Sequence, residues 1–551
     1  MKERLVGVSM VAILSVMTTA AHAQTPFRHR GSDSSHATFS PVPNEQIDPA
    51  SGALTLVATD LVLPGNAGFD LGITRTYSSS LYANYDSGST VLDEDSWAGI
   101  GWRLHFGRVL NPYATTGGAT SIELGDGSRH SLYTTATYPE GWMSPGFARY
   151  DRATFTLKTP NGYVYTFGHE ANLGGNLGVV RYVTEIRDPF NNRIEFTYFA
   201  APGPVDGISQ IRQYLSTTQV REVNFTYDSG LNTLATMTYA GRTWTYVHAD
   251  RGNGYSVLRE VHAPLGPPEL YDYTALPGEL TRFETRSGGV TTYTYQDAYR
   301  KASTLTNRTR VVTARAVSGR LVTAGTWTFA YGTGSNEDTT VISCACGTTT
   351  YRFNGTGLAG DFSAWKAGTL AEQTVSEPNG PVLESRTFTW LRSDVISSDP
   401  VAGQGGVWSD GAVYAALLQD STVTRGSQSW TTEYEYHGPS FNDFGQPWKV
   451  IESGQFTRTT ERTFQAGFSP HIVGRVATTW TRIGVEGIGA TWEYDLATGF
   501  VTSYVGPLSP RLRFSAHADG NLASQKDNLN HETTFENYTW GSHRSFALRT
   551  R

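Results

Sequence analysis

The first part of this chain alternates apolar and polar residues with a period of two. Two such segments, Leu54 to Leu63 and Phe69 to Tyr77, are separated by Pro64-Gly65-Asn66. An alternation of this kind puts successive side chains on opposite faces of a strand, and Pro, Gly and Asn favour a turn. The pattern therefore predicts two β-strands joined by a turn.

Three further segments combine the same alternation with turn residues in the middle. Asn and Gly tolerate the positive φ that tight hairpin turns require. The expected hairpins are Ser121 to Tyr133 with a turn at Asp126-Gly127, Thr154 to Phe167 with a turn at Pro160-Asn161-Gly162, and Tyr182 to Tyr198 with a turn at Asn191-Asn192.

Pairs of aromatic residues, separated by one Thr or Glu, recur through the rest of the chain. The pairs are Phe225 and Tyr227, Trp244 and Tyr246, Tyr293 and Tyr295, Trp327 and Phe329, Phe388 and Trp390, Tyr434 and Tyr436, and Trp492 and Tyr494. Because residues two apart share one face of a strand, each pair predicts a strand with an aromatic, packed face. The spacing is irregular, as in a degenerate repeat array rather than a strict solenoid.

Composition agrees with an all-β fold. Of 551 residues, 17% are charged and 12% aromatic, and 58 are glycine. Aromatic and β-branched residues favour strands, and glycine favours turns, whereas no long helical periodicity occurs. We expect an N-terminal β domain over residues 45–170, followed over residues 171–551 by an irregular array of β-hairpin repeats forming a curled sheet.

Charge and the N-terminus bear on partners and location. The formal charge is −7, with no basic stripe, which argues against a nucleic-acid partner. Lys2 and Arg4 precede an uncharged run and an Ala21-His22-Ala23 cleavage motif. We expect residues 1–23 to be a cleaved signal peptide and residues 24–44 a flexible lead-in. The mature chain would be secreted or at the cell surface, without a membrane span.

Cys344 and Cys346 are the two cysteines of the chain. They share one strand face, so they could form a local disulfide, remain free thiols, or supply half of a metal site. We expect the disulfide or free thiols before a metal.

Searches for catalytic motifs find incomplete ones. His169-Glu170 and His531-Glu532 begin an H-E-x-x-H zinc motif, but Leu173 and Phe535 occupy the second histidine position. No G-x-S-x-G motif or P-loop occurs, and Gly487-Ile488-Gly489 lacks the third glycine of a dinucleotide site. We expect no enzyme, with no catalytic residue, no cofactor-binding residue and no metal ligand.

Two surface features have alternative readings. Asp86 and Asp93-Glu94-Asp95 could hold Ca²⁺ but lack the loop spacing, so a solvated loop is favoured. Trp97, Trp102 and Trp142 could stack sugars, but core packing is favoured in an all-β chain.

Five short motifs in one order resemble the N-terminal region of secreted bacterial RHS or YD-repeat proteins. They are Asp48-Pro49-Gly52, Thr59-Asp60-Leu61, Leu63-Pro64-Gly65, Arg75-Thr76-Tyr77-Ser79 and Gly101-Trp102-Leu104. Degenerate copies of the YD repeat follow at Phe225-Thr226-Tyr227-Asp228, at Trp492-Glu493-Tyr494-Asp495 with Gly499, and at Asp519-Gly520-Asn521-Leu522.

The resemblance implies a non-catalytic secreted scaffold. In such proteins the repeats form a shell that encloses or presents a C-terminal effector in bacterial competition, so the implied partner is effector cargo or a further C-terminal chain. A cell-surface adhesion or carbohydrate-binding protein is the alternative, and a β-rich hydrolase a weaker one. Nothing after Asp519 resembles a toxin, and Phe514, Phe535, Tyr538, Trp540 and Phe546 would leave an apolar terminal unit, so we expect an incomplete array.

Overall fold

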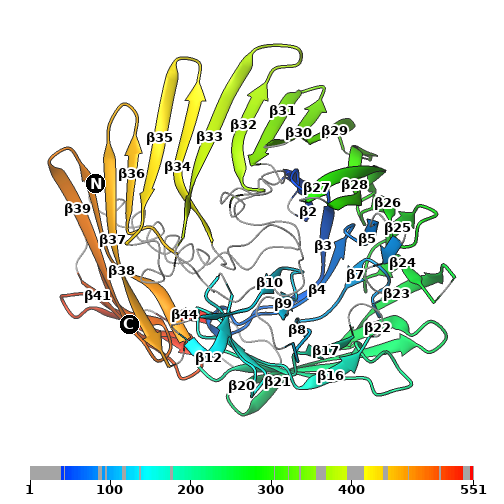
Figure 1. Ribbon diagram of the computed structural model, residues 1–551. Helices are drawn as coiled ribbons and strands as arrows, with labels where there is room; N and C mark the ends of the chain where they lie inside the picture. The colour runs from blue at the N-terminus through cyan, green and yellow to red at the C-terminus, as the bar shows by residue number, and fades with distance from the viewer. Residues whose placement is uncertain are drawn as a thin grey trace.

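The computed structural model (Figure 1) describes the chain in segments. These are residues 39–42, 44–84, 90–92, 96–114, 120–135, 138–144, 146–173, 178–252, 254–302, 305–320, 322–333, 337–354, 366, 368–393, 415–437, 445–469, 471–507, 511–537 and 546–549. The expected signal peptide, most of the lead-in, and the acidic positions Asp86 and Asp93 to Asp95 lie outside them.

Strands are almost the only regular secondary structure in the described residues, which confirms the all-β prediction. The first sheet has the order β1-β2-β3-β4-β7, with strands β1 (Phe39–Val42), β2 (Glu45–Ile47), β3 (Leu54–Leu63), β4 (Leu71–Ser78) and β7 (Trp102–Arg103). A 3-10 turn, η1 (Asn66–Gly68), joins β3 to β4. The second sheet has the order β10-β9-β8-β17-β16, with β8 (Gly107–Leu110), β9 (Ser121–Leu124), β10 (Arg129–Ser131), β16 (His169–Asn172) and β17 (Val179–Tyr182).

The third sheet is one long antiparallel ladder that begins at β11, runs to β44 and does not close into a barrel. Its first half contains β11 (Tyr133–Thr135), β12 (Tyr138–Met143), β13 (Arg149–Asp151), β14 (Thr156–Lys158), β15 (Val164–Thr166), β18 (Glu185–Arg187), β19 (Arg193–Tyr198), β20 (Ile208–Leu215), β21 (Thr218–Asp228), β22 (Thr233–Tyr239), β23 (Arg242–Asp250), β24 (Ser256–His262), β25 (Glu269–Tyr273), β26 (Leu280–Glu284), β27 (Gly289–Ala302) and β28 (Leu305–Gly319), with the hairpin β5 (Tyr82–Asn84) and β6 (Thr90–Leu92) paired to β28 through β5. Its second half contains β29 (Gly325–Thr333), β30 (Glu337–Cys344), β31 (Gly347–Asn354), β32 (Leu370–Ser376), β33 (Val382–Arg392), β34 (Ala416–Arg425), β35 (Gln428–Glu435), β36 (Lys449–Ser453), β37 (Arg458–Phe468), β38 (His471–Ile483), β39 (Glu486–Asp495), β40 (Phe500–Val505), β41 (Leu512–Ala516), β42 (Leu522–Lys526), β43 (Glu532–Asn537) and β44 (Phe546–Arg549).

The predicted hairpins are present with their turn residues in the expected conformations. β3 and β4 pair antiparallel across the predicted turn. Gly127, Gly162 and Asn191 have φ of +82°, +87° and +64° in their turns. The sheets do not divide at residue 170, because β11 to β15 already belong to the long ladder while β16 and β17 pair with β8.

The aromatic alternation is also confirmed. In the pair Trp244 and Tyr246 both rings are buried and the intervening Thr245 is exposed, and in Trp492 and Tyr494 both rings are more buried than Glu493. Directly paired residues of neighbouring strands share a face, so the ladder register carries this aromatic face from strand to strand. We call it the inner face, because the first sheet packs on it (Figure 1).

β-bulges recur where the aromatic strands end, and they explain the curl. Opposite Thr294 and Tyr295, for example, β28 carries one extra residue between Val312 and Ala314. A bulge bends its strand and increases local twist. A tyrosine of the following strand, β29, binds the backbone at this bulge. Tyr331 Oη donates a hydrogen bond to the Val312 carbonyl at 2.7 Å. The same bond joins Tyr436 to Leu418 and Tyr494 to Val476, each at 2.9 Å.

The bulges give the ladder two different edges. Most bulges lie at one edge, which also holds the ends of the aromatic strands and which we call the bulge rim; the register shifts at Gln213/Tyr214 and Val375/Ser376 lie at the other edge. We call that other edge, with the hairpin turns at residues 144–148, 159–163, 188–192 and 484–485, the tip rim. Repeated bending along one edge curls the ladder around the first sheet, as Figure 1 shows. In the described residues, no helix is long and apolar enough to cross a membrane.

Candidate functional site: the plug and the inner face

The first sheet and the segment before β7, residues 44–79 and 96–104, form a plug inside the curled ladder. Buried charge fixes it there. The guanidinium of Arg75 in β4 is fully buried and pairs with Asp60 of β3 at 2.7 Å and with Glu269 of β25 at 3.1 Å. Burial lowers the pKa of Arg75, but the Asp60 carboxylate outweighs this, so the pKa lies above its ordinary value. Arg75 also lies 5.2 Å from the centroid of the Trp102 ring.

Tyr77 and Trp102 bind the plug to the ladder through their polar atoms. Tyr77 Oη donates to the Gly278 carbonyl at 2.8 Å and accepts the Leu280 N–H at 3.0 Å. Burial raises the pKa of Tyr77, which keeps this donor protonated. Trp102 Nε1 donates to Tyr273 Oη at 2.9 Å. The residues that carried the family resemblance are thus the residues that dock the plug.

Gly101 is needed for this packing. Its φ is +85°, and a Cβ at this position would lie 2.7 Å from Tyr77 Cε2. A larger residue would therefore strain the backbone and displace the Tyr77 ring.

A second buried ion pair lies further along the ladder. Arg315 of β28 binds Glu45 of β2, with Nε–Oε1 at 2.5 Å, and its guanidinium lies 4.7 Å from the centroid of the Trp327 ring. Glu45, Glu269 and Arg315 were not identified from the sequence, because their partners lie 194 to 270 residues away. The three tryptophans weighed as sugar platforms, Trp97, Trp102 and Trp142, are all buried, which confirms core packing.

Beyond the plug, the inner face continues along the ladder. In the described residues, the core around the plug ends at Leu370, with Phe388 packed against it. Ladder register carries the same face onward from Phe388 to Tyr434 and Trp492. These rings are half-buried rather than buried. The plug therefore covers only part of the aromatic face.

The last hairpins of the ladder lie on the first ones, along a seam between the bulge rim and the tip rim. The Val473 N–H donates to the Pro160 carbonyl at 3.0 Å, and His471 Nε2 lies 2.8 Å from the Phe147 carbonyl oxygen. Ile472 forms a β-bridge with Asn161 and is fully buried.

The turn Asp519 to Asn521 continues the seam onto the plug. Asn66 Nδ2 donates to Asp519 Oδ2 at 2.7 Å, and the Ala67 N–H donates to Asn521 Oδ1 at 3.0 Å. Asn192 Nδ2 donates to the Asp519 carbonyl at 2.9 Å. The degenerate repeat motif Asp-Gly-Asn thus joins the end of the described ladder to its beginning.

Asp188 lies in the β18–β19 turn at this seam. It accepts hydrogen bonds from the backbone N–H groups of Phe190 and Asn192 at 2.9 and 2.8 Å. Burial, with a further contribution from the Asp519 charge, outweighs these bonds and raises the pKa of Asp188 to about 6. Of the terminal apolar residues, Phe514 and Phe535 are half-buried, and Tyr538 and Trp540 lie outside the described residues.

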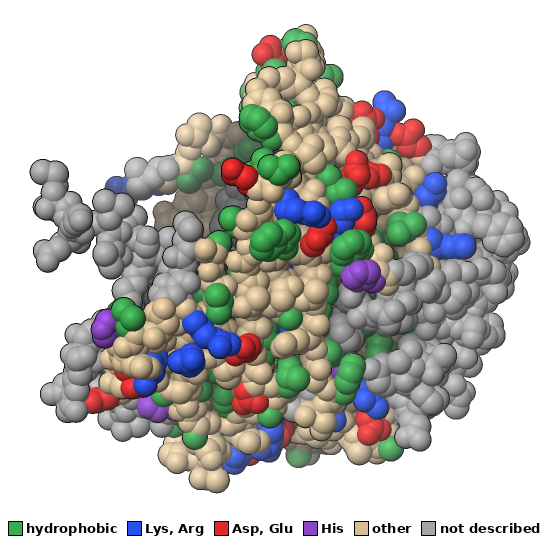
Figure 2. All heavy atoms as spheres, turned by 90° about the vertical axis from the view of Figure 1, so that its left-hand side faces the viewer, with side chains coloured by type: hydrophobic (Ala, Val, Ile, Leu, Met, Phe, Trp, Pro, Cys, Tyr) green, Lys and Arg blue, Asp and Glu red, His purple; other side chains and the backbone are tan. Residues whose placement is uncertain are grey.

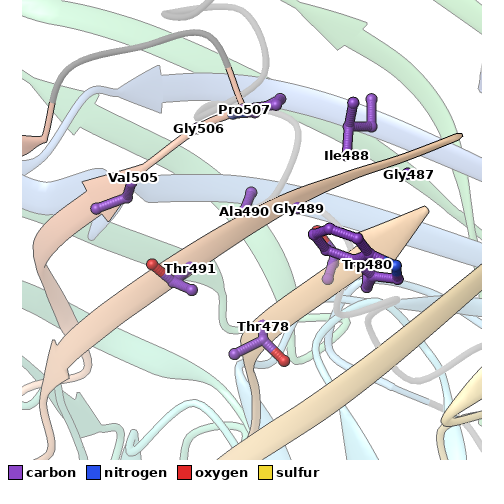
Figure 3. Close-up of a pocket in the computed structure, with 11 residues that line it drawn as sticks. Thr478, Trp480, Gly487, Ile488, Gly489, Ala490, Thr491, Val505, Gly506 and Pro507 are labelled. Carbon is purple, nitrogen blue, oxygen red and sulfur yellow. The ribbon is translucent and has the colours of Figure 1, made fainter. Parts of the chain in front are cut away.

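The opposite, outer face carries a shallow groove of about 610 Å³ near the β38–β39 hairpin (Figure 3). Trp480 lies across the backbone of Gly487 and Gly489, where an added Cβ would lie 2.8 and 2.5 Å from the indole. Thr478 and Thr491 continue the groove. One indole face therefore packs on glycine, and the side chain stays 47% exposed.

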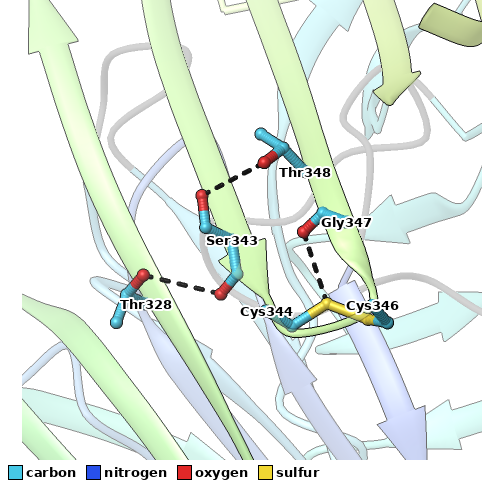
Figure 4. Close-up of a disulfide and its surroundings, with 6 residues drawn as sticks. All are labelled: Thr328, Ser343, Cys344, Cys346, Gly347 and Thr348. Atoms are coloured by element: carbon cyan, nitrogen blue, oxygen red, sulfur yellow. Dashed lines mark hydrogen bonds between the residues drawn. A yellow bond between two sulfur atoms is a disulfide. The ribbon is translucent and has the colours of Figure 1, made fainter. Parts of the chain in front are cut away.

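Cys344 and Cys346 form a disulfide at the β30–β31 turn, with the sulfurs 1.93 Å apart (Figure 4). Cys344 Sγ lies 3.4 Å from the Gly347 carbonyl oxygen. The described residues contain no group of three or more side chains placed to hold a metal ion.

The histidines of the two incomplete zinc motifs contact other side chains and backbone groups of the protein. The His169 ring stacks on Tyr198 with centroids 4.2 Å apart, and its Nε2 lies 2.6 Å from the Val205 carbonyl oxygen. His531 Nδ1 lies 2.9 Å from Asp527 in an exposed turn. The structure does not bring the two motifs together.

Comparisons with known proteins agree with this architecture. Residues 44–132, which include the plug strands β2 to β4 and β7, match a family model described as a domain of unknown function, DUF6531. No curated protein matches the chain. A solved structure entitled "Crystal Structure of TcdB2-TccC3" aligns with a TM-score of 0.52 at 7% identity, covering 92% of this chain and 56% of that one. A Photorhabdus luminescens Tc holotoxin pore aligns over 93% of this chain and 27% of that one, at 10% identity and a TM-score of 0.26.

The first of these alignments is a likeness of fold alone. It supports the large β-repeat fold that the sequence predicted. This chain spans little more than half the length of the matched TcdB2-TccC3 chain.

Proposed function

We propose that this chain is a secreted, non-catalytic shell of RHS type whose lumen receives another polypeptide, the C-terminal effector of a bacterial competition system. The observation that carries the proposal is the inner face beyond the plug, where Tyr434 and Trp492 continue an aromatic surface that the plug does not cover. A half-buried aromatic surface can bind the apolar side chains of an unfolded chain without sequence specificity. The buried ion pairs of Arg75 and Arg315 hold the plug in place on this face.

Protease protection of a fused polypeptide tests the proposal. A permanently unfolded, epitope-tagged tail is fused after Arg551, and the same tail is fused ahead of Asn44 in a second protein. We expect the C-terminal tail to survive limited proteolysis much longer than the N-terminal one. Equal cleavage of the two tails would contradict the proposal.

Matched variants assign the protection to the inner face. Tyr434→Glu/Trp492→Glu should shorten the survival of the tail, whereas Tyr434→Leu/Trp492→Leu, which keeps the surface apolar, should not. Thr389→Glu/Thr491→Glu adds the same charge at exposed outer-face positions of the same ladder and should leave protection unchanged. The melting temperature of each variant shows whether it is folded. Polysaccharide, ester and peptide substrates should show no turnover.

Carbohydrate binding is the second candidate, and Trp480 is the observation in its favour. A sugar ring presents C–H groups that pack on an exposed indole face, and Thr478 and Thr491 border the groove. Titration with chitohexaose, followed by tryptophan fluorescence, should then give saturable binding that Trp480→Ala abolishes. Trp430→Ala is the control, because this indole is also half-exposed but lies on the other face. No saturable change would exclude this candidate.

A further inference from the structure

Many acidic side chains of the ladder lie beside a basic one. Glu452, Glu461 and Glu493, in β36, β37 and β39, each pair with an arginine. Figure 2 shows the side of the molecule that carries these strands, where acidic and basic side chains lie next to each other. Asp188 at the seam differs, because it is 4% exposed and no lysine, arginine or histidine of the described residues pairs with it. A buried carboxylate without a cation is unfavourable.

A second carboxylate, that of Asp519 in the β41–β42 turn, reaches the same place. The amide of Asn192 joins the two turns, because its Nδ2 donates to Asp188 Oδ2 at 2.7 Å and to the Asp519 carbonyl at 2.9 Å. The Asp519 charge is one cause of the raised pKa of Asp188. Two neighbouring carboxylates oppose each other's ionisation, and a cation bound to both would remove that repulsion.

Amide oxygens surround this pair of carboxylates. Asn66, Asn192 and Asn521 are each at most 5% exposed. Asn66 Nδ2 donates to Asp519 Oδ2 at 2.7 Å. Carboxylate, side-chain amide and backbone carbonyl oxygens are the ligands of Ca²⁺, which takes about 6–8 of them. The described residues hold no group of three or more histidine, cysteine or acidic side chains placed for a metal, so an ion here draws on two carboxylates and on these neutral oxygens.

One oxygen of the cluster has no partner. Asn192 is fully buried, and its Oδ1 accepts no hydrogen bond from any described residue. Because the nitrogen of the same amide contacts Asp188 and Asp519, this oxygen lies at the cluster as well. Rotating the amide by about 180° exchanges its oxygen and nitrogen. The oxygen then faces the Asp188 carboxylate and the Asp519 carbonyl, and three oxygens converge as they do around a cation.

We propose that the seam holds a Ca²⁺ site. Its ligands are the carboxylates of Asp188 and Asp519, the Asp519 carbonyl, and the amide oxygens of Asn192 and Asn66. These residues come from the β18–β19 turn, the β41–β42 turn and η1 of the plug, so a bound ion fastens the end of the described ladder to its beginning and to the plug. No metal ligand was expected from sequence motifs, because the ligands lie 327 and 453 residues apart. Mg²⁺ fits less well, because it keeps several waters and demands octahedral geometry.

Calcium titration of the purified full-length exported chain, after removal of metals with EDTA, tests the proposal. Isothermal titration calorimetry with CaCl₂ should give one saturable site. Calcium should also raise the melting temperature, because an ion that binds the folded state alone stabilises it. Amide exchange of residues 517–521 should become slower when calcium is added. MgCl₂ at the same concentration should do none of these.

Matched variants assign the effect to the seam. Asp188→Asn/Asp519→Asn removes both charges and keeps the shape of the side chains, so it should keep at least the wild-type melting temperature without calcium. It should weaken calcium binding by at least about tenfold. Asp527→Asn is the control, because Asp527 accepts the Leu529 and His531 N–H groups, at 2.8 and 2.9 Å, in a turn like that of Asp188. This control should bind calcium as the wild type does.

Three results would overturn the proposal. The first is no saturable binding at CaCl₂ concentrations well above the ~1 mM that weak extracellular calcium modules require. The second is binding that the double variant keeps, or that Asp527→Asn weakens equally. The third is equal stabilisation by magnesium, which would indicate screening of the net negative charge. Asp519→Asn alone, at a half-buried position, repeats the test in a less perturbed variant, and unchanged binding there would also overturn the proposal.

Discussion

Removing the Arg75 guanidinium should destabilise the plug far more than removing an arginine from the surface. In Arg75→Met, the side chains of Asp60 and Glu269, which are 1% and 17% exposed, would keep their charges without the buried cation that they share. Breaking a buried ion pair by deleting one partner costs about 3–5 kcal/mol. We expect a loss of this size in the free energy of unfolding at neutral pH.

Arg458→Met is the matched control, because the Arg458–Glu452 pair is 53% and 38% exposed. Pairs at such exposure contribute about 0–1 kcal/mol. Urea unfolding, followed by tryptophan fluorescence, measures both losses, and Trp102 next to Arg75 reports on the plug directly. The double variant Arg75→Met/Asp60→Asn should recover part of the lost stability, because it removes one of the two carboxylate charges that no longer have a cation beside them. If Arg75→Met lost no more stability than Arg458→Met, the buried pair would not hold the plug.

Three further predictions concern the seam and the expected signal peptide. Asp188 has a pKa raised to about 6, above the ordinary value of an unfolded aspartate, so the stability that it contributes is full below about pH 4 and is lost as the pH rises through about 6. The difference in urea midpoint between wild type and Asp188→Asn should therefore shrink from pH 4 to pH 7, and a constant difference would contradict the assignment. Gly520→Ala should cost about 1–3 kcal/mol, because its Cβ would lie 2.6 Å from Phe190 at a φ of +89°. Gly484→Ala, at φ +61° in open space, should lose less stability. An equal loss in the two variants would argue against tight packing of Gly520 on Phe190. N-terminal sequencing of the exported protein should begin at Gln24, whereas a mature chain that starts at Met1 would refute the signal-peptide prediction.

Local structure could be predicted from the sequence because its causes are local. The alternation from Leu54 to Leu63 coincides with β3, and Asp126-Gly127 lies in the turn that the sequence predicted. The aromatic pairs identified the inner face, because a period of two fixes which side chains share a face.

Long-range features could not be predicted because no local pattern encodes them. The partners Glu45 and Arg315 are 270 residues apart, and no sequence motif around either residue indicates that the two are paired. The bulges that curl the ladder arise from one extra residue in a pairing register, which is defined only once both strands are placed. The seam follows from that curl, so the contact of Asp519 with Asn66 was not foreseen.

Hydrogen exchange tests most directly whether the seam holds the curled ladder around the plug in solution. We expect amides in β38, β41 and the turn from His517 to Asn521 to exchange as slowly as those in β3 and β4, because the seam fixes all of them. Fast exchange throughout residues 471–526, with protection confined to β3, β4 and the strands around the plug, would show that the seam does not form in solution and that the plug is held without it.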